Sequence, residues 1–389
     1  MSSAIRRACR SRAALPILGG VAALLLSGCG GGDAETPSAS TVPGPAASSP
    51  APTPASAPAA APAPASLPAV APAPASSPAA APPAASSPAP SPAGTVAAPA
   101  AAATATAQSS SNACSAIRPF YWEIGDAGGA LVSGSVAGSG DPTLYAGSTR
   151  LSIASASKWF YSSYFVQRAG GVLSASDVKF LNFQSGYAAR GFDCQPSQTV
   201  QQCVDQGSNG VYDAADDGAF SYSGAHMEKH AALNGLGAMN NAMLAAEIRS
   251  QVGAEIDLAY SAPQPAGGVV TTADDYAKLL RKVLRGDLKM HDALGAHPVC
   301  TNPRTCANAV NAPSPPGESW HYSIGHWVED DPVVGDGAFS SPGAFGFYPW
   351  IDRTKTSYGV LSRSAVGGAI DSVYCGRLIR KAWTTATPQ

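Results

Sequence analysis

The sequence predicts a mixed α/β fold in which an antiparallel sheet, built from both ends of one domain, is flanked by helices and encloses a mainly helical insertion. A hairpin pattern opens the domain, with strands at 120–123 and 130–136 around a glycine-rich turn. Three further strand patterns close it, at 320–329, 344–351 and 357–362. Because helical patterns lie between these two groups, the strands from the two ends are expected to meet in one sheet.

Helical patterns fill the middle of the domain and its end. One helix begins near Ser155, and its apolar face continues to a diglycine stop at 170–171. Another follows a capping signal at Thr272, where apolar residues recur at i, i+3, i+4 and i+7 until Gly286 ends the helix. A loop-rich stretch with short helices separates these two, and a last helix is expected over 370–383.

The first 29 residues have the organisation of an export signal. A basic start precedes an apolar run at 13–26, and residues 26–29 (LSGC) are similar to the lipobox of bacterial lipoproteins. By this resemblance Cys29 is acylated and becomes the mature N-terminus, and Gly30 after it favours the outer membrane. A transmembrane anchor is the alternative, but the apolar run is shorter than the roughly 20 residues of a span and contains proline and two glycines.

Residues 30–111 consist almost wholly of Ala, Pro, Ser, Gly and Thr. Such a segment buries too little apolar surface to offset its ordering entropy, so we expect a disordered tether. A proline-rich ligand for a partner domain is the alternative, although no aromatic or basic flank accompanies the repeats. The remaining residues, 112–389, are long enough for one large folded domain.

Charge and cysteine content limit the function classes. A net charge of -2 and a pI near 6.3 argue against a nucleic-acid partner. With the cysteines of the signal set aside, an even number remains, which predicts disulfides in an exported domain, although many pairings are possible. A zinc site is the alternative, but neither short cysteine spacing is C-x-x-C. Short loops and elimination favour Cys194 with Cys203, Cys300 with Cys306, and Cys114 with Cys375.

The most informative motif is Ser155-Ala156-Ser157-Lys158. A serine three positions before a lysine on one helix places both side chains on the same face, so that the amine can reach the hydroxyl. A lysine shielded from water, with Tyr222 beside it, can take the serine proton and make the hydroxyl a nucleophile. Free N–H groups in the first helical turn can also stabilise an oxyanion. The alternative is that Ser155 only caps an exposed helix.

Several ordered motifs resemble those of the serine penicillin-recognising hydrolases, in particular the branch with class C β-lactamases, DD-peptidases and related esterases and amide hydrolases. The resemblance covers nearly all of 120–385. The matching segments are 153–158 at the nucleophile, 183–187, 220–224 at the Tyr-x-Asn position, 265–274, 320–325, and Gly343, Gly346 and Asp352 near the third motif.

This resemblance implies a β-lactamase/transpeptidase-like fold and a set of roles. Ser155 would attack a carbonyl, and Lys158 and Tyr222 would share the proton transfers. The backbone N–H groups of Ser155 and Ala344 would bind the oxyanion. No metal or organic cofactor is implied.

Two departures from the family pattern fall on the expected substrate-binding residues Gly224, Ser341 and Gly343. Ser341 stands where the family has a lysine or histidine, so the cation that receives a substrate carboxylate is absent. Gly224 replaces the asparagine of Tyr-x-Asn and removes an amide that holds an acylamido carbonyl. Lys355 follows in the next turn and is interpreted as a surface charge. Both departures weaken a β-lactamase assignment.

Other candidate sites are weaker. His226 and His230 have i, i+4 spacing but match no metalloprotease motif, so we expect surface or helix-packing histidines. Ser185 could rival Ser155 only with a base nearby, and no lysine or histidine follows at short range. The chain contains no Gly-x-Ser-x-Gly elbow.

Together these features predict a monomeric serine hydrolase that forms an acyl-enzyme on an ester or amide of a small molecule or short peptide. It is expected to be lipid-anchored through Cys29, in the bacterial outer membrane, with the domain in the periplasm or at the cell surface. Two alternatives stay open: a DD-carboxypeptidase or β-lactamase, and a catalytically degenerate binding protein of the same shape.

Overall fold

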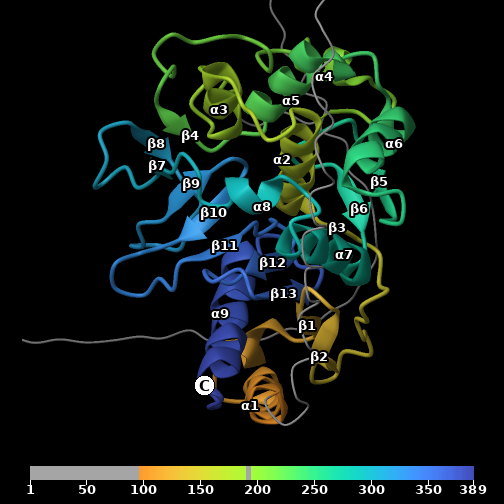
Figure 1. Cartoon of the computed structure of the whole chain (residues 1–389), viewed down its shortest axis with the longest axis vertical. Helices are drawn as coiled ribbons and strands as arrows, with labels where there is room; N and C mark the ends of the chain where they lie inside the picture. Colours follow the sequence, from red (N-terminus) through yellow and green to blue (C-terminus); the bar gives the residue numbers. More distant parts are fainter. Residues whose placement is uncertain (1–95, 190–193) are drawn as a thin grey trace, which may run out of the picture. The chain divides into compact units, whose positions relative to one another are not determined.

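The structure, a computed structural model, describes residues 96–189 and 194–389 (Figure 1). The predicted signal peptide, the lipidation site at Cys29 and most of the predicted tether lie outside the described residues. Within these two ranges, no helix combines the length and the apolar character needed to cross a bilayer.

One antiparallel sheet of eight strands forms the centre of the domain, in the order β2-β1-β13-β12-β11-β10-β9-β7. The first strand of the chain, β1, pairs directly with the last, β13, so that Tyr121 lies opposite Ser362. The sheet is therefore built from both ends of the domain, as the sequence predicted. Its strands are β1 (Phe120–Asp126), β2 (Ala130–Val136), β7 (Val299–Cys300), β9 (His321–Ser323), β10 (His326–Glu329), β11 (Ala338–Ser340), β12 (Tyr348–Ile351) and β13 (Ser357–Ser362).

The later strands differ from prediction in several places. The strand expected over 320–329 is a hairpin, because Ile324 and Gly325 adopt positive φ values of 37° and 78° and reverse the chain. A side chain at Gly325 would overlap the Ser162 hydroxyl of the helix beneath, so the turn needs glycine. Strand β11 was not predicted, since three residues between loops give no alternation to detect, and residues 344–347 are a turn rather than strand.

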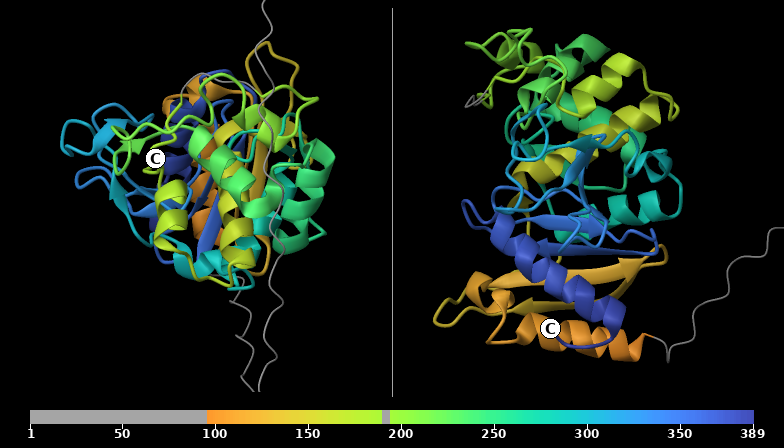
Figure 2. Two further views of the ribbon diagram at one scale, coloured as in Figure 1. Left: turned by 90° about the horizontal axis from the view of Figure 1, so that it is seen from above. Right: turned by 90° about the vertical axis from the view of Figure 1, so that its left-hand side faces the viewer.

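Helices cover both faces of this sheet (Figure 2). On one face lies α9 (Ala369–Thr385), whose Arg380 sits over the Trp350 ring of β12. On the other lies α7 (Ala273–Leu284), whose Arg281 donates to the Tyr358 hydroxyl of β13. Because β12 and β13 are covered on both sides, every residue in them is buried.

The central helix of the insertion is α2 (Ser157–Arg168), whose first ten residues are all buried. The predicted cap of α7 is confirmed, since the Thr272 hydroxyl accepts from the Asp275 N–H. The other elements of the insertion are η2 (Ala154–Ala156), α3 (Ala175–Leu181), α4 (Val200–Val204), α5 (Ala225–Ala231), η3 (Ala232–Leu236), α6 (Asn241–Val252), α8 (Met290–Ala293), and the short strands β3 (Leu151–Ser152), β4 (Phe220–Ser221), β5 (Leu258–Tyr260), β6 (Val269–Thr271) and β8 (Ala309–Asn311).

The folded part starts earlier than residue 112. Residues Ala97–Gln108 form α1, which packs against α9 through small buried side chains such as Ala103 and Ala107 (Figure 1). The prediction that 30–111 is wholly a tether is therefore wrong for this stretch. Alanine is the strongest helix former, and the single proline of the helix, Pro99, lies in the first turn, where no N–H is missed. The short 3-10 helix η1 (Ala113–Ile117) follows.

The favoured cysteine pairs are the ones that the structure joins. Cys114 of η1 is bonded to Cys375 of α9 across 261 positions of sequence. The other two bridges close short loops, Cys194 with Cys203 and Cys300 with Cys306. The long bridge fixes the start of the folded chain to its last helix.

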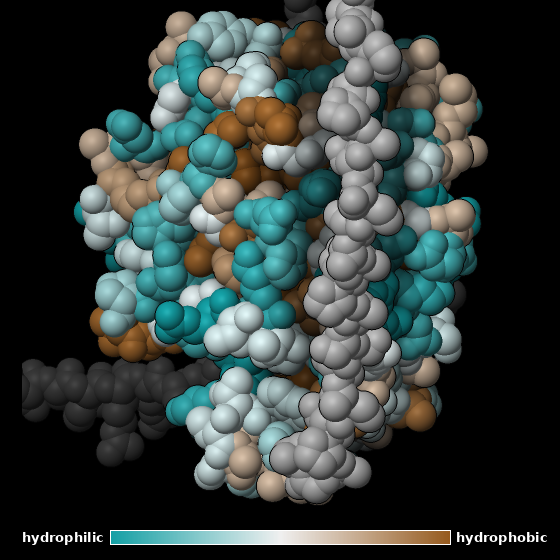
Figure 3. Space-filling view, in the orientation of Figure 1, coloured by the Kyte–Doolittle hydropathy of each residue, from teal (hydrophilic) through white to brown (hydrophobic). Residues whose placement is uncertain are grey.

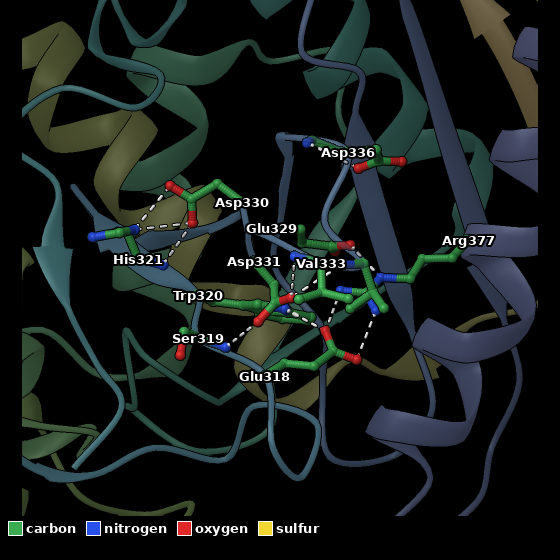
Figure 4. Close-up of polar contacts among 12 residues, drawn as sticks. Glu318, Ser319, Trp320, His321, Glu329, Asp330, Asp331, Val333, Asp336 and Arg377 are labelled. Atoms are coloured by element: carbon green, nitrogen blue, oxygen red, sulfur yellow. Dashed lines mark hydrogen bonds and ion pairs between the residues drawn. The ribbon is translucent and has the colours of Figure 1, made fainter. Parts of the chain in front are cut away.

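A buried ion network attaches α9 to the sheet (Figure 4). Arg377 donates to Glu329 of β10 and, through both terminal nitrogens, to Glu318. Arg380 donates to Glu329 over 2.8 Å and also to Asp336. Burial alone would raise the pKa of Glu329, but the charges of Arg380 and Arg377 outweigh it and hold the pKa at about 2. Glu329 is therefore ionised and fully paired inside the protein.

Apolar residues on the face in Figure 3 form separate areas among hydrophilic ones. The most exposed large apolar side chains come from different loops, for example Leu144, Val172, Val333 and Val366. Single exposed apolar residues of this kind are ordinary on soluble domains.

Candidate active site

A cavity of about 610 Å³ opens where the start of α2 meets the start of α5 and the 261–267 loop. Most of its lining is small or neutral: one large apolar side chain, Phe345, faces it, together with the Tyr222 ring. The lining residues are Ser152, Ala154, Ser155, Lys158, Ala189, Tyr222, Ser223, Gly224, Glu228, Ser261, Gln264, Ala266, Gly267, Asn311 and Phe345.

Ser155 lies in η2, one turn before α2, and its side chain is half-buried at the cavity. The Lys158 Nζ lies 2.9 Å from the Ser155 Oγ and also donates to the Ala266 carbonyl oxygen over 2.9 Å. Lys158 is only 4% exposed, so its amine is held on the serine in a place that excludes most water. Ser155 does not cap α2, because the N-cap position belongs to Ala156 and carries no side-chain bond.

Tyr222 follows β4 and covers the lysine. The Lys158 Nζ lies 4.9 Å from the centre of the Tyr222 ring, which in turn stacks on Trp327 at 5.2 Å. The Tyr222 N–H donates to the Asn311 carbonyl oxygen and side chain, which fixes the backbone here. The structure thus brings Ser155, Lys158 and Tyr222 to one cavity from segments more than 60 positions apart in sequence, as the motifs predicted.

Ser341 and Gly343, the residues at the third motif, contact the backbone of the turn that carries Ser155. The Ser341 hydroxyl donates to the Ser155 carbonyl oxygen over 3.2 Å. A side chain at Gly343 would overlap the Ile153 carbonyl oxygen, so glycine permits this close approach of two backbones. Both residues are buried, and neither is among the described residues that line the cavity. A substrate contact through either one, and oxyanion binding by the Ala344 N–H, stay predictions.

Lys158 is the only cation among the residues described as lining the cavity. Lys355, the tempting substitute for the missing third-motif cation, donates to the His291 carbonyl oxygen over 2.7 Å and lies outside this lining. It is half-buried rather than a free surface charge. The described cavity therefore offers a substrate carboxylate no cation apart from the lysine that serves the nucleophile.

The two histidines of α5 are packing residues, and neither is at the surface. The Ser185 hydroxyl lies 2.6 Å from the His226 Nδ1, while the His226 Nε2 faces the Ser221 carbonyl oxygen at 3.1 Å. The expectation that Ser185 has no base at hand is thus wrong, because the fold brings His226 to it from 41 positions away. Both side chains are buried outside the described cavity lining, and burial lowers the pKa of His226 to about 4. This pair ties down the backbone beside Tyr222.

His230 occupies a second buried position on the same helix. Its Nε2 lies 3.0 Å from the Asp177 Oδ1 and its Nδ1 lies 2.7 Å from the Tyr161 hydroxyl. Within the described ranges, no group of three or more His, Cys, Asp or Glu side chains is arranged to hold a metal ion.

Glu228 is the ionisable residue of the described lining that the motifs missed. It lies on α5, four residues after Gly224, and is 1% exposed. Burial raises the pKa of its carboxyl to about 7, in spite of the opposing effects of the Ala266 N–H and the Lys158 charge. The i, i+4 spacing from Gly224 was the available signal, since it places both residues on the helix face that meets the cavity.

The site thus presents the Ser155 hydroxyl, hydrogen-bonded to the buried amine of Lys158, at the wall of a mostly neutral cavity. An amine in this position can accept the hydroxyl proton and return it to a leaving group.

Comparison with solved structures shows the fold. EstCE1, a hydrolase with promiscuous acyltransferase activity, matches with a TM-score of 0.53 and 14% identity, over 74% of this chain and 99% of that chain. D-amino acid amidase from Ochrobactrum anthropi matches with a TM-score of 0.50 and 14% identity, over 69% of this chain and 95% of that chain. No family model matches the chain, and no curated protein sequence matches it.

These matches confirm the predicted fold class. The chain has the β-lactamase/transpeptidase-like fold, with mixed helices and an antiparallel sheet, and shares this fold with the EstCE1 hydrolase and the D-amino acid amidase. At identities this low, the likeness shows the fold alone, and an activity has to follow from the residues of the site.

Proposed function

We propose that the chain is a serine hydrolase that acts through an acyl-enzyme on an ester or amide of a small substrate. The observation that carries this proposal is the 2.9 Å contact between the buried Lys158 Nζ and the Ser155 Oγ at the cavity wall. A nucleophile bonded to a base in a concave site is the arrangement that covalent hydrolysis requires.

The reaction follows from these positions. The Ser155 Oγ attacks the substrate carbonyl carbon while its proton passes to the neutral Lys158 amine. The carbonyl oxygen takes the negative charge and is bound by the Ser155 and Ala344 N–H groups. When the tetrahedral intermediate collapses, the bond to the leaving group breaks, and that group receives the proton from Lys158, with Tyr222 assisting. Water then attacks the acyl-enzyme by the same proton route and frees Ser155.

The composition of the cavity favours neutral substrates. Apart from Lys158 no described lining residue is a cation, and the Ser341 hydroxyl is occupied by the Ser155 carbonyl. A penicillin or a peptide ending in a free carboxylate thus lacks its usual ionic partner. We therefore place simple esters and amides ahead of cell-wall peptides and β-lactams.

Labelling with activity-based probes tests the proposal. The purified protein should react covalently with a fluorophosphonate, and the adduct should map to Ser155. Ser155→Ala should remove both the label and the hydrolysis of a p-nitrophenyl ester without loss of the folded circular-dichroism spectrum. A native protein that resists the fluorophosphonate would support the binding-protein alternative, and faster labelling by a fluorescent penicillin would favour the β-lactamase or DD-carboxypeptidase alternative.

We also propose that the enzyme is a monomer anchored by lipid at Cys29, in the outer membrane, with its domain in the periplasm or at the cell surface. The lipobox-like residues 26–29 support this location. Metabolic labelling with a palmitate analogue tests it, since Cys29→Ala should lose the lipid label and leave the membrane fraction.

A further inference from the structure

Glu228 has a buried carboxyl group. Among the described residues, one of its oxygens has a hydrogen-bond partner and the other has none. Its Oε1 accepts from the Ala266 N–H over 3.1 Å. Its Oε2 is shielded from solvent and has no hydrogen-bond partner among the described residues. A buried, half-satisfied carboxyl is costly, so its presence beside a cavity calls for a function.

One peptide unit connects this carboxyl to the nucleophile. The residue whose N–H is held by Glu228, Ala266, is the same residue whose carbonyl oxygen accepts from the Lys158 Nζ. In the described ranges no direct ion pair of 4.0 Å or less joins Glu228 to Lys158, so the mechanical link runs through Ala266. A shift of the Glu228 carboxyl would therefore shift the acceptor that holds the lysine on Ser155.

Gly224 makes room for this arrangement. A Cβ at position 224 would lie 3.3 Å from the Glu228 Oε2 and 3.3 Å from the Ala266 Cβ. An asparagine side chain, as in the Tyr-x-Asn motif that this segment resembles, would have to pass through the same space. Gly224 therefore leaves open the space beside the Glu228 carboxyl. This explains why the asparagine of the Tyr-x-Asn motif is replaced by glycine here.

The charges around Glu228 leave Lys158 as its main electrostatic partner. The titratable groups that face it are Lys158 and Tyr161 from α2 and Tyr260 from β5. Burial raises the pKa of both tyrosine hydroxyls well above the ordinary value, so they are uncharged near neutral pH. Among these groups, Lys158 is therefore the electrostatic partner of an ionised Glu228.

We propose that Glu228 is a positioning residue for the nucleophile pair: it holds Lys158 on Ser155 through the Ala266 peptide. The inference rests on the proposed serine-hydrolase function. Without the hydrogen bond from the Ala266 N–H, Lys158 should lose its place beside the Ser155 Oγ.

Two substitutions test the hydrogen bond. Glu228→Gln keeps an oxygen that can accept from the Ala266 N–H, whereas Glu228→Ala removes it. For Glu228→Gln we expect kcat on a p-nitrophenyl ester to stay within about threefold of the native value. For Glu228→Ala we expect kcat to fall by about tenfold or more, with little change in KM. Glu255→Gln, which removes a carboxylate on the outer 253–257 turn paired with Lys282, is the matched control and should leave both constants unchanged.

A measurement without turnover tests the same link. The ¹⁵Nζ resonance of Lys158, recorded by NMR at one pH in the Ser155→Ala background, should move in Glu228→Ala and stay close to its starting position in Glu228→Gln. Equal losses of kcat in Glu228→Ala and Glu228→Gln, or no loss in either, would overturn the inference. If instead the native protein fails to label at Ser155 while the lysine resonance still moves in Glu228→Ala, the proposed function fails and the positioning role stands.

Discussion

Lys158 extends its amine to the Ser155 Oγ, 2.9 Å away, from the first turn of α2, and Tyr222 closes over the pair. Because this amine is the only described base in contact with the nucleophile, Lys158→Met should lower kcat/KM on esters by roughly 10²–10⁴-fold. Stopped-flow acylation measures the effect directly. Lys179→Met, which removes a half-exposed lysine paired with Asp217, should change neither rate nor fold. Equal losses in the two variants would contradict the assigned role.

Substrate charge provides the next prediction. With no described cation free to bind a carboxylate, p-nitrophenyl butyrate should be hydrolysed faster than the mono-p-nitrophenyl ester of succinate, which adds a carboxylate to the acyl chain. A native preference for the succinate ester would show that another cation reaches the substrate.

Gly343 should tolerate no side chain. A methyl group there would overlap the Ile153 carbonyl oxygen, one peptide before the nucleophile turn. We expect Gly343→Ala to cost roughly 1–3 kcal/mol of unfolding free energy and to lower kcat, because the turn that carries Ser155 must move. Urea denaturation and ester hydrolysis measure the two effects. At Gly129, by contrast, a Cβ would meet nothing within 4 Å, so Gly129→Ala should be nearly silent.

Acid should weaken the attachment of α9. The pKa of Glu329 is about 2 in the folded protein, below its ordinary value of 4.5, so its contribution to stability is complete above about pH 4.5 and is lost as pH falls towards 2. That contribution is on the order of 3 kcal/mol. Glu329→Gln should therefore be less stable than the native protein at pH 7, and the difference should shrink between pH 5 and pH 2.

Urea denaturation at a series of pH values tests this expectation. Asp287→Asn serves as the control, since Asp287 and its partner Arg285 are both more than 40% exposed and contribute little. A stability gap between Glu329→Gln and the native protein that stays constant down to pH 2 would refute the expectation.

Local chemistry explains which features the sequence could predict. The Thr272 cap, the hairpin and the Ser155–Lys158 spacing are set by residues a few positions apart, and all three appear in the structure. Contacts between distant segments were not predictable in this way. The pairing of Ser185 with His226 and the link from Glu228 through Ala266 depend on how loops return to the cavity.

The amino-acid composition gave a wrong prediction for residues 97–108, which form a helix rather than part of the tether. The alanines of α1 continue the tether's composition, and their helical state depends on a partner surface, α9, that lies near the far end of the chain. The short strand β11 was likewise defined by its neighbours, because three residues carry no periodicity of their own.

The start of the described domain meets its C-terminal end, and this contact has a mechanical consequence. The Asn112 side chain donates to the Gln389 carbonyl oxygen, and the Gln389 N–H donates to the Thr106 hydroxyl, at the end of the domain away from α3 and α5 (Figure 1). A pulling force that enters the domain through α1 can peel that helix from α9 only as far as Cys114. There the covalent bond to Cys375 transfers the load to α9 and its buried arginines. The cavity is thus insulated from tension on the N-terminal side.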